Sequence, residues 1–204
     1  IPNSFSEDVL KEAAQLPTYS IPQNEILRRR DMRNILTCTI DPDEAKDFDD
    51  ALSFQVLDTG NYQIGIHIAD VTHYVQEQTL IDEEAYTRGT SIYLVDRVIP
   101  MLPERLSNEL CSLRPNEDKL CMSVIVEMDP NAKVIRHKIC RTVICSDYRL
   151  TYRQAQDILD NQVQDSQLKN PQLTIAINTL DQLAKQLRAN RFRLGAINFE
   201  TPEV

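Results

Sequence analysis

Apolar, strand-forming segments separated by polar turn sequences run through the middle of the chain and predict a sheet made of β-hairpins. One predicted hairpin covers residues 51–68 and turns at Asp-Thr-Gly-Asn, residues 58–61. A second covers residues 120–145 and turns at Asp-Pro-Asn-Ala, residues 129–132. Residues 35–40 form one more strand-like segment ahead of the first hairpin.

Helical patterns occupy the two ends of the chain. Near its start, Ser4 and Glu7 match the S-x-x-E capping box, an apolar face follows, and Pro17 ends the predicted helix. Thr151 and Gln154 make a second capping box. We therefore predict that a helix begins at each of these places.

A longer helix is predicted after Asn170-Pro171, where a capping residue is followed by proline in the first turn. Its apolar residues recur at helical spacing, which is more typical of a core face than of a binding groove. They are Leu173, Ile177, Leu180, Leu183, Ala184 and Leu187. Residues 195–199 are typical of the start of a further strand.

Shorter elements lie between the two hairpins. Residues 80–88 and 104–113 are predicted to be helical and residues 90–95 to be extended. Because the strands come as hairpins and do not alternate with helices, the pattern predicts an α+β fold. We expect a mixed, largely antiparallel β-sheet with flanking helices.

The distribution of charge changes what the net charge of −9 implies. A negative total argues against a nucleic-acid partner. Residues 41–50 alone carry −5, however, whereas residues 88–153 carry +3, from eleven Lys and Arg against eight Asp and Glu. A focus of negative charge beside a mildly basic stretch fits an enzyme that holds metal and phosphate together.

The remaining composition predicts a cytoplasmic protein. No stretch of 18 apolar residues and no signal pattern occurs, and the absence of an initiator methionine leads us to expect a piece of a longer protein. The five cysteines lie in apolar segments without a CxxC pair, so buried reduced thiols are expected rather than a zinc or redox site. They are Cys38, Cys111, Cys121, Cys140 and Cys145.

Six of the ten residues from Asp41 to Asp50 are carboxylates. Two carboxylates about 4 Å apart repel by roughly 4 kcal/mol at the effective dielectric of a protein surface. Such crowding calls for protonation or for a bound cation. Strand-like segments hold this run at both ends, and a rigid all-oxygen site suits Mg²⁺ or Mn²⁺.

Several interpretations of the acidic run compete. A calcium EF-hand loop is excluded, because it requires glycine and glutamate where this chain has Lys46 and Leu52. Asp41-Pro42-Asp43 matches the D-x-D motif of haloacid-dehalogenase-type phosphatases, but that fold needs a parallel sheet with crossover helices. A solvated acidic loop is the plain structural alternative. A divalent-metal site acting on phosphodiesters is favoured, since carboxylate-bound metals activate water and stabilise the leaving oxygen.

Residues 39–53 closely resemble the signature of the ribonuclease II/ribonuclease R family, whose catalytic RNB domain belongs to 3′-to-5′ exoribonucleases. The resemblance continues, in the same order, through residues 65–75, 91–93, 98–113 and 195–197. The His-Ile-Ala-Asp-Val form within it is most similar to bacterial ribonuclease R.

The resemblance implies both a domain division and a set of site residues. Residues 1–34 would be a linker helix and connector, and residues 35–204 the N-terminal half of an RNB catalytic domain. The family's D-x5-D-x-D-D pattern carries four functional aspartates, which would hold Mg²⁺ or Mn²⁺ and orient the attacking water. They fall on Asp41, Asp47, Asp49 and Asp50, with Asp49 the most critical for the chemistry.

Other residues receive weaker assignments. Tyr93 matches the family's tyrosine that packs on a base near the RNA 3′ end, a sequence-tolerant contact. Arg105 and Arg114 are candidates for contacting RNA phosphates, with ordinary surface charge as the alternative. His67 lies in a family motif, but we expect it to be a hydrogen-bonded core residue.

The resemblance implies an enzyme that hydrolyses single-stranded RNA from its 3′ end to nucleoside 5′-monophosphates. Neither DNA nor a membrane is expected as a partner, and no signal identifies a protein partner. The 204-residue piece is expected to be inactive alone, because the family's catalytic arginine lies outside it. A D-x-D phosphatase and a non-catalytic RNA-binding regulator remain as rival functions.

Overall fold

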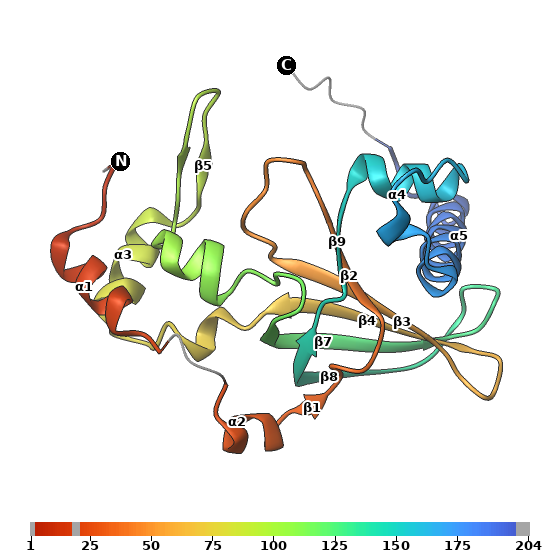
Figure 1. The fold of residues 1–204 in the computed structure, drawn as a ribbon, viewed down its shortest axis with the longest axis horizontal. Helices are drawn as coiled ribbons and strands as arrows, with labels where there is room; N and C mark the ends of the chain where they lie inside the picture. The colour runs from red at the N-terminus through yellow and green to blue at the C-terminus, as the bar shows by residue number, and fades with distance from the viewer. Residues whose placement is uncertain (1–2, 18–20, 199–204) are drawn as a thin grey trace.

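A seven-stranded mixed sheet forms the centre of the computed structural model, which describes residues 3–17 and 21–198 (Figure 1). Its strand order is β1-β8-β7-β4-β3-β2-β9. The strands are β1 (Arg30–Asp31), β2 (Thr37–Asp41), β3 (Asp50–Val56), β4 (Tyr62–Ala69), β7 (Asp118–Met128), β8 (Val134–Cys145) and β9 (Tyr148–Thr151). All neighbours from β8 to β2 pair antiparallel, and only the outer pairs β1–β8 and β2–β9 are parallel. The predicted α+β class is confirmed.

Helices lie at both ends of the sheet (Figure 1). They are α1 (Glu7–Gln15), α2 (Gln23–Leu27), α3 (Leu80–Arg88), α4 (Tyr152–Leu159) and α5 (Pro171–Arg193). Short turns of other helix types are η1 (Val71–His73), η2 (Arg105–Leu110, a π-helix) and η3 (Ser166–Leu168). A separate two-stranded ribbon, β5 (Ile92–Tyr93) with β6 (Val98–Ile99), projects from the body (Figure 1). No helix in the described ranges is long and apolar enough to cross a membrane.

Two of the three predicted helix starts are confirmed. The Thr151–Gln154 capping box is present in both directions, and Asn170 caps α5 ahead of Pro171. The first prediction was wrong, because Ser6 rather than Ser4 caps α1 by accepting from the Val9 amide. Ser6 is the residue whose extended backbone lets its hydroxyl reach that amide.

Three further expectations differ from the structure. The connector contains α2 and β1, neither of which was predicted. The helix predicted over residues 104–113 is shorter, and its π-helical turn ends at Leu110. No strand occupies residues 195–198, and the last residue of that prediction, Phe199, lies outside the described residues.

The sheet has a hydrophobic cluster on each face. Ala51 and Phe54, three residues apart on β3, point to opposite sides. The cluster around Ala51 brings α1, α3 and η2 against the sheet, and the cluster around Phe54 includes α5. On α5 the predicted core face is correct for Leu173, Ile177 and Leu183, but wrong for Ala184 and Leu187, which are exposed, while Ala176 is buried.

Candidate active site

The acidic loop, residues 41–50, leaves the sheet at one end of two adjacent strands. Asp41 is the last residue of β2 and Asp50 the first of β3. Asp41 is also paired with Thr151 of β9, and the Ala69 amide donates to the Asp49 carbonyl at 3.0 Å. The ends of the loop are therefore fixed by the sheet, although residues 42–49 between them form no helix or strand.

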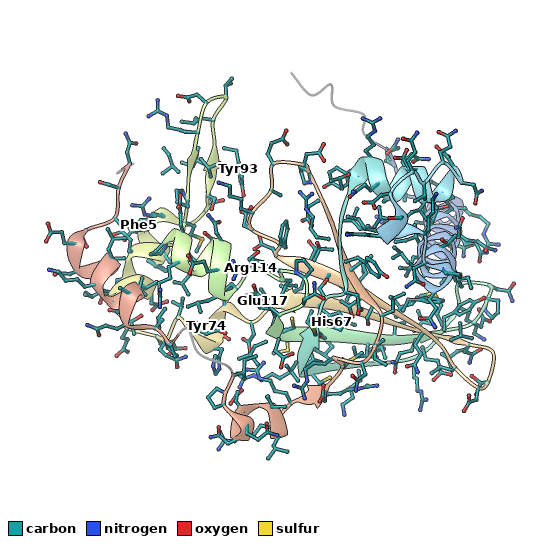
Figure 2. All side chains as sticks on the ribbon, viewed as in Figure 1. Phe5, His67, Tyr74, Tyr93, Arg114 and Glu117 are labelled. Atoms are coloured by element: carbon teal, nitrogen blue, oxygen red, sulfur yellow. The ribbon has the colours of Figure 1, made fainter. Side chains whose placement is uncertain are left out.

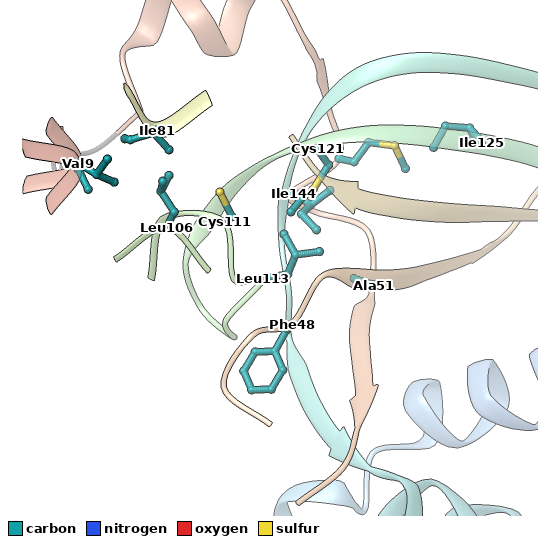
Figure 3. Packing of buried hydrophobic residues seen from close by; sticks show 13 residues of the cluster. Val9, Phe48, Ala51, Ile81, Leu106, Cys111, Leu113, Cys121, Ile125 and Ile144 are labelled. Atoms are coloured by element: carbon teal, nitrogen blue, oxygen red, sulfur yellow. The ribbon is translucent and has the colours of Figure 1, made fainter. Parts of the chain in front are cut away.

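Side-chain contacts hold the second half of this loop. The Ser112 hydroxyl donates to the Lys46 carbonyl at 2.8 Å and accepts from the Phe48 amide at 3.0 Å. The Leu113 amide donates to the Phe48 carbonyl at 2.9 Å. Phe48 is itself buried in the same hydrophobic cluster as Leu113 (Figure 3). Burial of Phe48 fixes the chain between Asp47 and Asp49.

Arg149 of β9 holds the first half of the loop. Its Nη2 donates to the carbonyls of Pro42 and Asp43, at 2.6 and 2.8 Å. Its guanidinium carbon also lies 5.5 Å from the centre of the Phe48 ring. Ser112 and Arg149 were not singled out from the sequence, because neither has a local signal. Their contacts reach residues 64 and 107 positions away.

Electrostatic repulsion in the acidic loop is only partly relieved by Arg149 and Thr39. Burial raises the pKa of the half-buried Asp41 carboxyl, and the charges of Asp50 and Asp47 raise it further. Desolvation, followed by the charges of Asp47, Asp50 and Asp41, also raises the pKa of Asp49. Asp49 as a whole residue is exposed to solvent. Nearby protein atoms nevertheless exclude water from part of the space around its carboxylate, and this accounts for the desolvation. The charges of Asp47 and Asp50 thus lie close enough to oppose the ionisation of both Asp41 and Asp49.

The same carboxylates fit a hard divalent cation. Asp41 Oδ2 is buried and makes no hydrogen bond of ordinary geometry with the described residues, although the neighbouring Thr39 hydroxyl still lowers the pKa of the carboxyl. A poorly satisfied ionised oxygen is costly in a protein. Within the described residues, however, no three Cys, His, Asp or Glu side chains are arranged to hold a metal ion by themselves. Asp41, Asp47, Asp49 and Asp50 were predicted to converge on one cation, but in this structure they do not form a complete metal-binding site. A small cation that takes one or two carboxylates and completes its shell with water and phosphate oxygens matches this donor set.

Tyr93 lies beside the acidic loop, on the projecting ribbon (Figure 2). Its side chain is 68% exposed. Desolvation, the charges of Asp47 and Asp49, and a hydrogen bond to Asp47 all raise the pKa of its hydroxyl. An exposed aromatic ring next to an acidic site leaves a face free for a flat ligand.

The two candidate arginines have structural partners elsewhere. Arg105 Nη2 donates to the Leu16 carbonyl at 2.8 Å, just beyond the end of α1. Arg114 pairs with Glu117 at 2.9 Å. Neither contact involves the acidic loop.

His67 has the structural role that was expected. It is fully buried, with Ser123 Oγ 2.7 Å from Nδ1 and Ser53 Oγ 2.9 Å from Nε2. Burial lowers its pKa to about 4. Gly65 sits next to this group, and a Cβ there would collide with Ser53 Oγ and His67 Nε2. The ring is therefore neutral at pH 7 and belongs to the core.

The sheet connections do not support the phosphatase alternative. The strand that follows Asp41 is β3, which pairs antiparallel with β2. The parallel partner of β2 is β9, which comes only after both hairpins. Asp43 of the D-x-D sequence is exposed in a turn.

Comparison with known proteins gives one family. A family model described as "RNB domain" matches residues 29–204. Ribonuclease R 1 of Lactococcus lactis subsp. lactis (strain IL1403) is 43% identical over 204 residues, which cover 100% of this chain and 25% of that protein. This chain thus spans about a quarter of the length of that curated relative.

Solved structures agree on the fold. Mycoplasma genitalium RNase R in complex with ribose methylated single-stranded RNA has a TM-score of 0.88 at 29% identity, over 98% of this chain and 31% of that chain. Yeast Ssd1, a pseudonuclease, has a TM-score of 0.74 at 18% identity, over 87% of this chain and 21% of that one. At that identity the second likeness concerns the fold alone.

Proposed function

The chain belongs to the RNB domain family, and from this premise we propose that the protein carrying it is a metal-dependent 3′-to-5′ exoribonuclease of the ribonuclease R type. It would hydrolyse single-stranded RNA and release nucleoside 5′-monophosphates. The observation that carries the proposal is the acidic loop, where the charges of Asp47 and Asp50 add to burial in raising the pKa of Asp41 and Asp49, and where a buried oxygen of Asp41 lacks a hydrogen bond of ordinary geometry to the described residues.

We assign Asp41, Asp47, Asp49 and Asp50 to the metal site, with Mg²⁺ as the cation and Mn²⁺ as its substitute. When bound, such a cation lowers the pKa of an attacking water and stabilises the leaving oxygen of the phosphodiester. Asp41 and Asp50 are anchored by β2 and β3, so they would supply fixed oxygens. Asp47 and Asp49, on either side of the buried Phe48, would orient the water and complete the site.

Tyr93 would position the 3′-terminal nucleotides by packing its ring on a base. Its place on the exposed ribbon, next to Asp47, supports this role, because a base stacked there would lie near the acidic loop. Replacing Tyr93 by Ala should raise KM for RNA, since a stacked base contributes about 1–3 kcal/mol, whereas Tyr93→Phe should keep most of the affinity. Arg105 and Arg114 receive no RNA contact in this proposal, because both are engaged elsewhere.

A Mg²⁺-dependent degradation assay tests the proposed function. We would incubate the full-length protein with 5′-labelled single-stranded RNA, with Mg²⁺ or with EDTA, and identify the products. Mononucleotide release from the 3′ end, only with Mg²⁺, is the expected result. Asp49→Asn should lower kcat by orders of magnitude and leave RNA binding intact or tighter, because a metal ligand and a repelling charge are both lost.

Asp43→Asn is the matched control. It removes the same charge from the same loop, but Asp43 is exposed in a turn and has no part in the proposed site. Its turnover should stay near that of the unmodified protein. Wild-type protein without activity, or an Asp49→Asn variant as active as Asp43→Asn, would refute the assignment and favour a non-catalytic RNA-binding role.

A further inference from the structure

Residues 42–49 have no regular secondary structure of their own, so the positions of Asp47 and Asp49 depend on what holds the loop. Ser112 holds residues 46 and 48 from one side, through the two hydrogen bonds described above. The start of the loop is held by a different element, through a side chain of β9.

That side chain is Arg149. It stands opposite Thr39 in the parallel pairing of β9 with β2, two residues before the Thr151–Asp41 pair. Residues two apart on a strand share a face, so Arg149 projects on the same side as Asp41. Its charge acts on the Asp41 carboxyl, which places the guanidinium beside the proposed site.

Arg149 joins two separate parts of the loop. Its bonds to the Pro42 and Asp43 carbonyls fix the chain just after Asp41. Its guanidinium lies 5.5 Å from the ring centre of Phe48, the residue between Asp47 and Asp49. The guanidinium is planar and holds its donors in a fixed geometry, so it can bond the two carbonyls with its face toward the aromatic ring, whereas an ammonium group is a compact charge without that fixed geometry.

We infer that Arg149 is a positioning residue of the active site, which sets the geometry of the aspartates by tying the beginning of the acidic loop and Phe48 to strand β9. This inference rests on the proposed nuclease function, because a reaction is needed for the geometry to matter. Arg149 acts through the loop backbone and touches neither RNA nor metal. The inference assigns it no part in the chemical step itself.

The test compares Arg149→Gln, Arg149→Lys and Arg153→Gln in the full-length protein. Arg153 is exposed and lines a pocket together with Asp43, and its variant loses the same charge. Four readouts are needed: kcat, the Mg²⁺ concentration for half-maximal activity, RNA affinity in EDTA, and amide hydrogen exchange of residues 43–48. Circular dichroism and thermal unfolding confirm that each variant is folded.

Arg149→Gln should lower kcat by about 10²-fold, the size of effect that a small misplacement of reacting groups produces. It should also raise the Mg²⁺ requirement and speed exchange in the loop, without changing RNA affinity in EDTA. Arg149→Lys should recover part of the loss, since one carbonyl contact can be remade. Arg153→Gln should resemble the unmodified protein in all four. If Arg149→Gln does not fold, Arg149→Lys replaces it in the test. We expect this variant to need a higher Mg²⁺ concentration for half-maximal activity than the unmodified protein.

Two results would overturn the inference. Arg149 variants that match Arg153→Gln would show that the loop keeps its geometry without the tether. Unchanged loop exchange with weakened RNA affinity and a smaller salt dependence would show that Arg149 contacts a phosphate instead. Failure of the proposed function would give a different result, because the unmodified protein itself would then lack Mg²⁺-dependent turnover. In that case, faster exchange of the loop amides in Arg149→Gln, but not in Arg153→Gln, would still support the tether.

Discussion

His67 links the buried polar groups of three neighbouring strands. Ser53 of β3 and Ser123 of β7 contact its two ring nitrogens, and Ser123 is in turn 2.6 Å from Thr142 Oγ1 of β8. Satisfied groups of this kind are tolerated in a core, whereas a charged ring there would need a partner for its charge. The depressed pKa follows from this burial.

The pH dependence of stability should report this histidine. Its pKa is about 4 in the folded chain against an ordinary value of 6.5. Between these values the unfolded chain binds a proton that the folded chain does not, so stability should fall as pH drops from 6.5 to 4, by up to ~3 kcal/mol. Urea unfolding of the 204-residue chain across this range, with NMR titration of the ring, measures it.

A His67→Gln variant isolates this contribution. The raised pKa values of Asp41 and Asp49 act with the opposite sign, because those groups hold protons longer in the folded state. They are present in both proteins and cancel in the comparison. The same slope with and without His67 would contradict the prediction.

The Arg29–Asp70 pair should be sensitive to losing one partner. The two side chains are 2.7 Å apart and almost fully buried. Asp70→Asn would leave the buried Arg29 with Glu25, 2.7 Å from its Nε, as its remaining acidic partner, so the loss should lie below the ~3–5 kcal/mol that typically follows when a buried charge loses its sole partner. Urea unfolding at pH 7 should show such a loss. Asp96→Asn is the control, because its pair with Arg97 has the same 2.7 Å distance but is exposed, and its stability should not change.

At the scale of the elements, Ser112 connects the end of η2 to the acidic loop. Ser112→Ala would leave the buried Phe48 amide without its acceptor, which costs about 1–3 kcal/mol. Exchange of that amide should therefore accelerate by about tenfold or more. Ser107→Ala is the control, since the Ser107 hydroxyl donates to its neighbour Asn108 at 3.2 Å and not to the acidic loop. Equal exchange of the Phe48 amide in both variants would rule out the tether.

Local sequence signals predicted the elements well where the deciding contacts are local. The turn at residues 58–61 and the Thr151 cap involve neighbours only, and both are present. The α1 cap was misplaced by two residues, because two serines compete there and only backbone geometry distinguishes them. The short α2 depends on packing of its buried Ile26, which no periodicity reveals.

The site was predicted only in part, for the same reason. Crowded charge and a family resemblance located the acidic loop, since both are written in consecutive residues. The pairing of Asp41 with Thr151 and the contacts of Ser112 and Arg149 join distant parts of the chain. Such contacts arise from the order of the strands, and a single sequence has no pattern that specifies them.

At the scale of the whole molecule, the charge of the acidic loop opposes the proposed RNA substrate. The loop carries −5, and an RNA backbone is itself anionic. Arg149, beside the loop, already donates to two carbonyls. If the proposed function holds, affinity for RNA should come largely from basic groups away from this loop, and the chain spans only about a quarter of the length of its relative.

We predict that the isolated 204-residue chain binds single-stranded RNA weakly and degrades it far more slowly than the full-length protein. An arginine at the reacting phosphate commonly contributes about 10³-fold or more in phosphoryl transfer, and basic contacts to the backbone supply most of the nonspecific affinity. The measurement is mononucleotide release from end-labelled RNA with Mg²⁺, for both proteins at equal concentration. Asp49→Asn versions of each reveal contaminating nuclease. Release by the isolated unmodified chain at the full-length rate, absent from its Asp49→Asn version, would show that these residues bind and cleave RNA unaided.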